Sequence, residues 1–254
     1  MLLVIDVGNT NISLGLMQGN EVIGSFRLTT KTPRTSDEFG LCIKELLDMT
    51  KLQDDDIEAV IISSVVPKIM YSLTSAIVKF LHKDPIIVGP GIKTGISIRT
   101  DNPREVGADR IVDISMAYHT YHKSCIIVDF GTATTFDYIS GEGVFKYTVI
   151  APGLGIVANA LTSQTAKLPE IEIQKPESIL NGNTITGMQA GVIYGYIGSV
   201  EYIIKQMKKE LKLKDCLVIA TGGLGKVIAK ETKEIDLFDP DVAYKGMRIL
   251  YDLN

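Results

Sequence analysis

Cysteine and histidine are scarce in this sequence, with three residues of each among 254. Cys42, Cys125 and Cys216 form an odd set without a C-x-x-C pair. A disulfide framework is therefore not expected, and the pattern favours reduced thiols that pack as small apolar side chains. The histidines also lack the spacing of a zinc site.

Long apolar runs are missing too. No segment approaches the run of about 20 apolar residues that a membrane-spanning helix needs. The first residues carry no basic region and meet an acid at Asp6, which is not the pattern of a signal peptide. We therefore expect a cytoplasmic protein without a membrane partner.

The chain has no excess of positive charge. Lysine and arginine total 26 against 30 aspartate and glutamate residues, giving a net charge of −4. This balance argues against a nucleic-acid partner. Hydrophobic residues make up 45% and charged residues 22%, which excludes a disordered or collagen-like chain and leaves room for one large or two modest domains.

Short runs rich in β-branched residues alternate with amphipathic stretches, which is typical of an α/β protein. One unit occurs twice, about half the chain length apart. Residues 2–10 form an apolar strand that ends in Asp6-Val-Gly8-Asn9-Thr10. Residues 125–132 form an apolar strand that ends in Asp129-Phe-Gly131-Thr132.

The similarity continues beyond these loops. Each copy goes on with a hairpin, around Gly19-Asn20 in the first and Gly141–Gly143 in the second. Each later has another strand with a small-residue loop, at 59–67 and 217–223. Two such units facing each other would bring both Asp-x-Gly loops to one cleft. Amphipathic patterns predict helices over 36–50, 67–81, 108–122, 183–212, from about 224, and over 241–252.

The Asp6-Val-Gly8-Asn9-Thr10 segment has two interpretations. It can be an ordinary turn at a strand end, because these residue types favour turns. It can also hold phosphate, since glycine lets backbone N–H groups approach closely and the aspartate can hold Mg²⁺ through water. Two copies in register favour the phosphate-binding interpretation.

Further motifs follow in a fixed order along the whole chain. They are Asp6-Val-Gly-Asn-Thr10, Ser63-Ser-Val-Val-Pro67, Gly89-Pro-Gly-Ile-Lys-Thr-Gly95, Val106-Gly-Ala-Asp-Arg110, Asp129-Phe-Gly-Thr132, Ala151-Pro-Gly153 and Thr221-Gly-Gly223. The paired hairpins resemble the superfamily of acetate and sugar kinases, Hsp70 and actin. The ordered set resembles the type III pantothenate kinases.

That resemblance implies a fold of two ribonuclease-H-like domains, 1–115 and 116–254, each a mixed sheet with flanking helices, around a central nucleotide cleft. The implied activity is phosphorylation of pantothenate by ATP with Mg²⁺ to 4'-phosphopantothenate, the first step of coenzyme A biosynthesis. The implied partners are the small-molecule substrate and a second copy in a homodimer, with the substrate pocket near the interface.

The resemblance also assigns roles to residues. Asp109 is the implied general base, and Asp129 is implied to bind a monovalent cation, K⁺ or NH₄⁺. The implied ATP and phosphate contacts are Asp6, Val7, Gly8, Asn9, Thr10, Asn11, Ile12, Ser13 and Thr132. The implied substrate contacts are Gly107, Ala108, Asp109, Arg110, Thr184 and Thr100. Judged from its sequence context alone, Thr184 reads as a helix N-cap.

Three positions depart from the family pattern. Thr100 stands where tyrosine is common, Asp113 where asparagine is common, and Lys146-Tyr147-Thr148 where a glycine pair is common. These bulky residues either narrow the cleft or have repacked, and alternation along a strand favours repacking, with an outward Lys146 and a Tyr147 that fills apolar space. Two alternatives stay open: a divergent non-catalytic paralogue with a regulatory or binding role, and a kinase of another small hydroxy compound.

Overall fold

The computed structural model describes residues 1–254, which form two compact units. Unit 1 contains Met1–Ile96, Asp101–Thr120 and Asp241–Asn254, and unit 2 contains Ser97–Thr100 and Tyr121–Pro240. The C-terminal segment thus packs into unit 1. The expected division into ribonuclease-H-like domains 1–115 and 116–254 stays a prediction.

Each unit is built on one mixed β-sheet. The strands of unit 1 are β1 (Leu2–Val7), β2 (Asn11–Gln18), β3 (Glu21–Thr29), β4 (Ala59–Ser64) and β5 (Ile86–Ile87). The strands of unit 2 are β6 (Ser97–Ile98), β7 (Cys125–Phe130), β8 (Ala133–Ile139), β9 (Val144–Pro152), β10 (Leu217–Thr221) and β11 (Leu237–Phe238).

The two sheets have the same topology. Their orders are β3-β2-β1-β4-β5 and β9-β8-β7-β10-β11, with β6 added beyond β9. In both sheets three consecutive strands, β1–β3 and β7–β9, are antiparallel neighbours. Two further strands, β4 and β5 in unit 1 and β10 and β11 in unit 2, continue the sheet in parallel with β1 and β7. The repeat read from the sequence, a duplicated mixed sheet with flanking helices, is therefore confirmed.

Nine helical segments complete the fold. Unit 1 holds α1 (Ser36–Met49), η1 (Asp54–Asp56), α2 (Pro67–Leu81), η2 (Pro103–Glu105), nearly all of α3 (Ala108–Tyr121), and α7 (Val242–Asp252). Unit 2 holds α4 (Leu154–Ser163), α5 (Thr184–Glu210) and α6 (Gly225–Ala229). The six expected helices are all present, whereas α4 had no counterpart among the expected ones.

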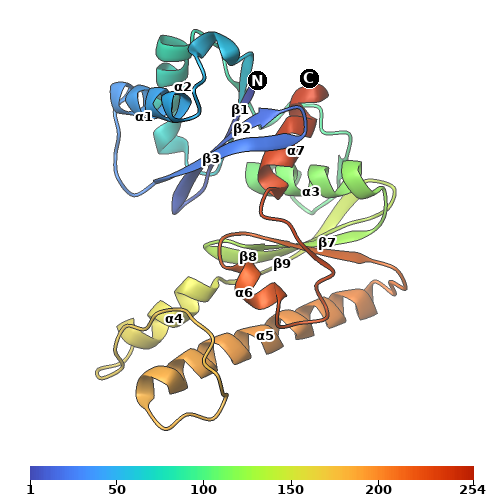
Figure 1. The fold of residues 1–254 in the computed structure, drawn as a ribbon. Helices are drawn as coiled ribbons and strands as arrows, with labels where there is room; N and C mark the ends of the chain where they lie inside the picture. Colours follow the sequence, from blue (N-terminus) through green and yellow to red (C-terminus); the bar gives the residue numbers. More distant parts are fainter. The chain divides into compact units, whose positions relative to one another are not determined.

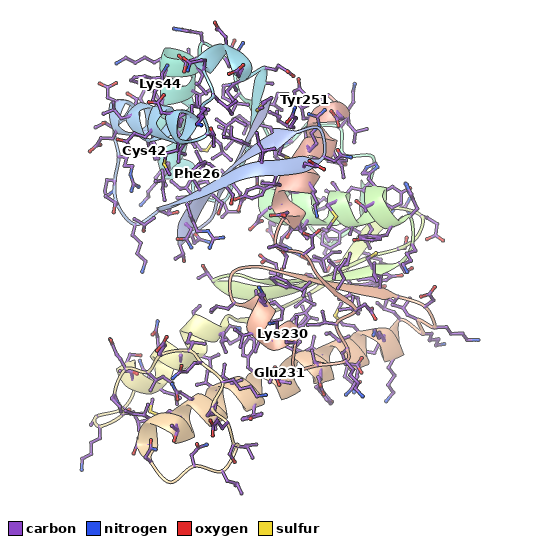
Figure 2. The ribbon with its side chains drawn as sticks, viewed as in Figure 1. Phe26, Cys42, Lys44, Lys230, Glu231 and Tyr251 are labelled. Atoms are coloured by element: carbon purple, nitrogen blue, oxygen red, sulfur yellow. The ribbon has the colours of Figure 1, made fainter.

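Side-chain alternation along β1 divides the core of unit 1 into two layers. Leu3, Ile5 and Val7 pack with the apolar faces of α1 and α2. Phe26 of β3 extends this layer beneath α1, which carries Cys42 and Lys44 (Figure 2). Leu2 and Val4 point to the opposite face, where α3 and α7 pack. Asp6 continues this second set, so its side chain lies on the α3 and α7 face.

The core of unit 2 follows the same rule. Ile126, Val128 and Phe130 of β7 pack with residues of α4, α5 and α6, and α5 runs along that face of the sheet (Figure 1). Asp129 alternates with these three residues along β7, so its side chain lies on the opposite face of the sheet and points away from α5.

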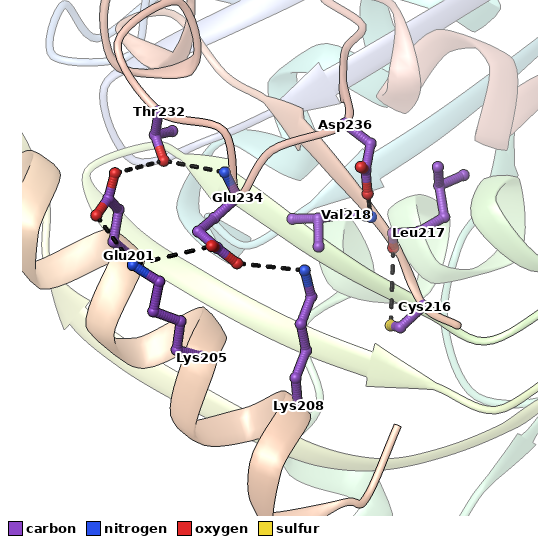
Figure 3. Close-up of polar contacts among 9 residues, drawn as sticks. All are labelled: Glu201, Lys205, Lys208, Cys216, Leu217, Val218, Thr232, Glu234 and Asp236. Atoms are coloured by element: carbon purple, nitrogen blue, oxygen red, sulfur yellow. Dashed lines mark hydrogen bonds and ion pairs between the residues drawn. The ribbon is translucent and has the colours of Figure 1, made fainter. Parts of the chain in front are cut away.

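A polar network fastens the end of unit 2 from which β10 starts (Figure 3). Glu234 is bridged by Lys205 at 3.8 Å and by Lys208 at 3.4 Å, both on α5. Asp236 then accepts a hydrogen bond from the backbone N–H of Val218 at 2.8 Å. Exposed ion pairs contribute little stability each, so the network mainly fixes where β10 begins.

The stretch from Lys146 to Thr148 differs from the expected alternation. The register shifts between Tyr138 and Ile139, which pair with Tyr147 and Phe145, so Lys146 is the extra residue of a β-bulge. Lys146 points outward as predicted, but the bulge exposes Tyr147 as well, at 44%. The expectation that Tyr147 fills apolar space is therefore wrong. Its ring stacks on Tyr138, with centroids 6.5 Å apart.

None of the helices combines the length and the hydropathy that crossing a membrane requires. All three cysteines are free thiols. Burial raises the pKa of Cys125 to about 12, which leaves this thiol protonated at neutral pH.

Candidate functional site

Asp6 lies at the centre of a row of polar side chains that crosses the sheet of unit 1. It pairs in register with Ser13 on β2 and with Ser63 on β4. Residues paired in register point to the same face of a sheet, so both hydroxyl groups flank the carboxylate. Ser63 is fully buried and Ser13 is half-buried.

Unit 2 contains the same arrangement around its own carboxylate. Asp129 of β7 pairs in register with Thr135 on β8 and with Thr221 on β10. The duplicated fold has thus placed a hydroxyl, a carboxylate and a hydroxyl at equivalent positions in both sheets.

The Asp6 carboxylate is held in a poorly solvated position. Burial first, and then the negative charge of Asp109, raise the pKa of Asp6 from 3.8 to about 7. The nearby Ser63 hydroxyl lowers this pKa to a smaller extent. Even so, neither Asp6 Oδ1 nor Ser63 Oγ has a partner in full hydrogen-bond geometry, although both atoms are buried.

The loop after Asp6 is tightly closed by backbone hydrogen bonds. Gly8 N–H donates to the carbonyl of Asn11 at 2.9 Å, and the Thr30 hydroxyl donates to the carbonyl of Gly8 at 2.7 Å. The loop leaves three polar side chains exposed, those of Asn9, Thr10 and Asn11. Val7 and Ile12 are completely buried, so they offer a ligand only backbone groups.

Asp109 is positioned by the first turn of α3. Its Oδ1 accepts a hydrogen bond from the backbone N–H of Arg110 at 2.8 Å. A Cβ atom on Gly107 would lie 2.5 Å from the same oxygen and 3.4 Å from Val65 Cγ1. Glycine is therefore required for the carboxylate to lie where it does. Arg110 and Ala108 are half-buried beside it.

Asp129 is packed against two glycine α-carbons. A Cβ on Gly222 would lie 2.6 Å from Asp129 Oδ1, and one on Gly131 would lie 3.3 Å from Oδ2. Gly222 also has φ +92°, a conformation that favours glycine. The two glycines let the backbone pack closely against a carboxylate whose oxygens suit a hard cation.

Thr132 belongs to a loop that is held in place by Gly153. The backbone N–H of Gly153 donates to the carbonyl of Thr132 at 3.1 Å. A Cβ on Gly153 would lie 2.2 Å from that carbonyl oxygen, so no other residue allows this approach. The Thr132 side chain itself is exposed.

The remaining two predicted substrate contacts, Thr100 and Thr184, belong to unit 2. Thr184 is exposed and is the first residue of α5. The N-cap is Asn183, whose side chain accepts from Thr186 N–H at 3.0 Å, so the interpretation of Thr184 as an N-cap is wrong. Thr100 lies in unit 2, and its Oγ1 is buried without a partner.

No group of three or more His, Cys, Asp or Glu side chains lies in a metal-binding arrangement. A cation at either carboxylate therefore needs water or a substrate phosphate for its other ligands. The unpartnered, buried Asp6 Oδ1 fits a water-mediated contact to Mg²⁺, and the cradle around Asp129 fits a cation with few protein ligands.

Residues 2–206 match the family described as type III pantothenate kinase. A type III pantothenate kinase from Agathobacter rectalis is 51% identical over 251 residues, which cover 99% of this chain and 96% of that protein. The chain belongs to the type III pantothenate kinase family. It is therefore an ATP-dependent kinase, and the resemblance read from the ordered motifs is confirmed.

Solved structures support the fold. A candidate 2-dehydro-3-deoxygalactonokinase from Sinorhizobium meliloti aligns with a TM-score of 0.63 at 11% identity, covering 99% of this chain and 96% of that one. A candidate Baf family transcriptional activator from Campylobacter jejuni aligns with a TM-score of 0.59 at 18% identity, covering 98% and 97%. Both likenesses concern the fold alone.

Three further residues shape the site without having been assigned to it from the sequence. Ser63 adjoins Asp6, Gly222 cradles Asp129, and Gly153 supports the Thr132 loop. All three lie in motifs that the sequence displays. Ser63 could have been selected by aligning the two repeats, because it then occupies the same position as Thr221.

Proposed function

We propose that the chain transfers the γ-phosphoryl group of ATP to the primary hydroxyl of pantothenate, with Asp109 as the general base. The hydroxyl oxygen forms the new bond to phosphorus while the bond between the γ-phosphorus and the β,γ-bridging oxygen breaks, releasing ADP. The hydroxyl proton passes to Asp109 and from there to solvent. The product is 4'-phosphopantothenate, the first intermediate of coenzyme A biosynthesis.

The position of Asp109 is the observation that carries this proposal. Its carboxylate starts a helix, is fixed by the Arg110 N–H, and lies near enough to Asp6 to influence that residue's pKa. A base must be held beside the hydroxyl that it deprotonates, and a positioned base typically contributes about 10²–10⁴-fold in rate. Gly107 allows this placement because it has no Cβ.

We assign ATP binding to the two Asp-x-Gly loops. In unit 1, the turn closed by Gly8 carries the exposed side chains of Asn9, Thr10 and Asn11. Such loops suit phosphate oxygens, and Asp6 would hold Mg²⁺ through water. In unit 2, Thr132 would contact a phosphate from the loop that Gly153 supports. The bound Mg²⁺ would offset the negative charge of the phosphates.

We assign the acidic end of pantothenate to Arg110, because a guanidinium fork matches a carboxylate in geometry and charge. Gly107 and Ala108 precede it at the start of α3. Thr100 and Thr184 stay proposed substrate contacts that rest on the family resemblance.

A coupled assay tests the function directly. ADP release is measured with ATP and Mg²⁺, first without and then with pantothenate, and then with a panel of other small primary alcohols. We expect ADP release to depend on pantothenate and to exceed that with any other alcohol. Release that depends on a different alcohol would overturn the substrate assignment, and no release with any of them would overturn the proposed activity.

We further propose that Asp129 binds a monovalent cation, and predict that Asp129→Ala abolishes the stimulation of kcat by K⁺ or NH₄⁺. The carboxylate supplies the negative charge, and Gly131 and Gly222 pack closely against its two oxygens. Rates are measured while KCl replaces NaCl at constant ionic strength. The matched control is Asp215→Ala, an exposed carboxylate at the opposite end of β10. Equal rates of the unaltered protein in Na⁺ and K⁺ would contradict the assignment.

We propose a homodimer in which a second copy covers the outer face of α5. A cavity of about 270 Å³ opens there between α4, α5 and β9. Its lining is mainly apolar and includes Val157, Gly191 and Gly195. A Cβ atom at either glycine would meet nothing within 4 Å, so this helix face is open in one chain.

Gly195→Arg is therefore expected to convert the dimer into a monomer, because a buried charge without a partner is costly. Light scattering after size exclusion measures the mass. Leu41→Arg is the control, since it adds the same charge at an exposed apolar position of α1. A monomeric unaltered protein, or a Gly195→Arg dimer, would contradict the proposed interface.

We also place the reaction in the cytoplasm. Reduced cysteines are usual in that compartment, and all three thiols here are free.

A further inference from the structure

Ser63 has a hydroxyl whose position the proposed reaction leaves unexplained. The residue is completely buried at the end of β4, and its Oγ has no partner in full hydrogen-bond geometry, although the hydroxyl lies near enough to Asp6 to lower that residue's pKa. A buried polar group without a partner costs stability, and a small apolar residue would avoid this cost. Packing alone therefore does not explain why this position has a hydroxyl group.

The register of the sheet places the Ser63 hydroxyl beside the Asp6 carboxylate. Ser63 is paired with Asp6, and Asp6 Oδ1 is the other buried atom of unit 1 without a partner. On the other side of Asp6, the Ser13 hydroxyl is already engaged, because it interacts with the phenol of Tyr244 and lowers the pKa of that group. Ser63 has no such competing partner.

The segment after Ser63 links Asp6 to the general base. Val65 N–H donates to the Val7 carbonyl at 3.1 Å, which continues the pairing of β4 with β1. A Cβ on Gly107 would lie 3.4 Å from Val65 Cγ1, so the end of β4 also borders the turn that carries Asp109. The same short segment thus adjoins both carboxylates.

The second copy of the fold supplies independent support. Thr221 occupies the position equivalent to that of Ser63, is buried, and is paired in register with Asp129. The two repeats differ at most other positions of these strands, yet both have a buried hydroxyl beside the carboxylate.

We infer that Ser63 is a positioning residue that orients the Asp6 carboxylate for Mg·ATP by donating a hydrogen bond from its buried hydroxyl. This inference rests on the proposed role of Asp6 in nucleotide binding. Hydroxyl donors of this kind fix the rotamer of a carboxylate, and removing the partner of a cation-binding group typically costs about 10–100-fold.

The test is a set of three variants at two adjacent positions. Ser63→Ala removes the hydroxyl, and Ser63→Thr retains it in the form that the second unit uses. Ser64→Ala removes the neighbouring hydroxyl, which accepts from Val66 N–H at 3.1 Å and belongs to no proposed contact. Calorimetry measures the Kd of a non-hydrolysable ATP analogue with Mg²⁺, and steady-state kinetics gives the KM for ATP and for pantothenate.

We expect Ser63→Ala to raise the Kd and the KM for ATP about 10-fold, with little change in the KM for pantothenate. Ser63→Thr is expected to recover the affinity of the unaltered protein within about 3-fold, and Ser64→Ala to retain it. An unchanged Kd in Ser63→Ala, or an equal loss in Ser63→Ala and Ser64→Ala, would overturn the inference. Because nucleotide binding is measured without pantothenate, these outcomes are separate from a failure of the proposed reaction.

Denaturant unfolding of the same samples separates positioning from folding. Loss of an unpartnered buried hydroxyl is expected to leave stability equal or higher. A Ser63→Ala protein that binds Mg·ATP normally per folded molecule, but unfolds at lower denaturant, would assign Ser63 a structural role instead.

Discussion

Replacing Asp109 by asparagine is expected to lower kcat about 10²–10⁴-fold, because the proton acceptor is lost while the shape of the side chain is kept. The asparagine Oδ1 can still accept the hydrogen bond from Arg110 N–H that Asp109 accepts at 2.8 Å. The start of α3 should therefore stay intact. The Kd for Mg·ATP is expected to change by less than about 3-fold.

Stopped assays with purified protein give kcat, and calorimetry gives the Kd on the same samples. Asp55→Asn is a suitable control, since it removes an exposed carboxylate from η1. A folded Asp109→Asn protein with a kcat near that of the unaltered chain would remove Asp109 from the role of base.

Replacing Asp6 by asparagine should have opposite effects on activity and on stability. Activity is expected to fall at least about 100-fold in kcat/KM for ATP, because the carboxylate proposed to hold Mg²⁺ beside the phosphates is lost. In the absence of Mg²⁺ and nucleotide, the melting temperature at pH 8 is expected to rise by about 3–8 °C. The variant no longer buries a negative charge close to Asp109.

The gain in stability should depend on pH in a defined direction. The pKa of Asp6 is about 7 in the folded chain against 3.8 ordinarily. Between these values the folded state retains a proton that the unfolded state releases, so the unaltered protein loses stability as the pH rises through this window. At pH 4 the Asp6 carboxyl group is protonated in the folded chain, so the advantage of Asp6→Asn should almost vanish.

Thermal melts of both proteins at pH 4 to 8 test this account. A stability difference that does not grow between pH 4 and 8 would show that Asp6 is not the buried, raised-pKa carboxylate described above. Mg²⁺ with ATP should stabilise the unaltered protein more than Asp6→Asn, since binding to the folded state shifts unfolding.

Much of the fold could be predicted because its periodic signals are local. The β2–β3 hairpin was predictable from Gly19-Asn20, where Gly19 adopts φ +58° at the turn. Pro67 is the first residue of α2, as its fixed φ favours. The repeat along the chain also gave the duplicated sheet, because both copies keep the same strand order.

Other elements depend on tertiary contacts that no local pattern contains. Helix α4 was missed because Pro152 and the glycines beside it indicate a break in the chain, whereas Pro152 ends β9 and Gly153 is the N-cap. The bulge at Lys146 changes the exposure of Tyr147, and a bulge has no signal in alternation alone. Strands β5 and β11, of two residues each, are too short to show a period.

The candidate site, like the fold, could be predicted from the sequence only in part. The residue types at Asp6, Asp109 and Asp129 could be selected from motifs, because their chemistry is specific. Their environment could not, since the burial that raises the pKa of Asp6 arises from packing between distant segments. The role of Gly107 depends on a 2.5 Å approach that only the folded turn creates.

We propose that the two carboxylates of unit 1 have separate roles, Asp6 toward the nucleotide and Asp109 toward the acceptor hydroxyl. The most direct test measures the Kd for Mg·ATP and kcat in Asp6→Asn and Asp109→Asn side by side. We expect weakened nucleotide binding in Asp6→Asn. In Asp109→Asn we expect normal nucleotide binding with a kcat reduced about 10²–10⁴-fold. Normal binding in Asp6→Asn together with weakened binding in Asp109→Asn would contradict this proposal.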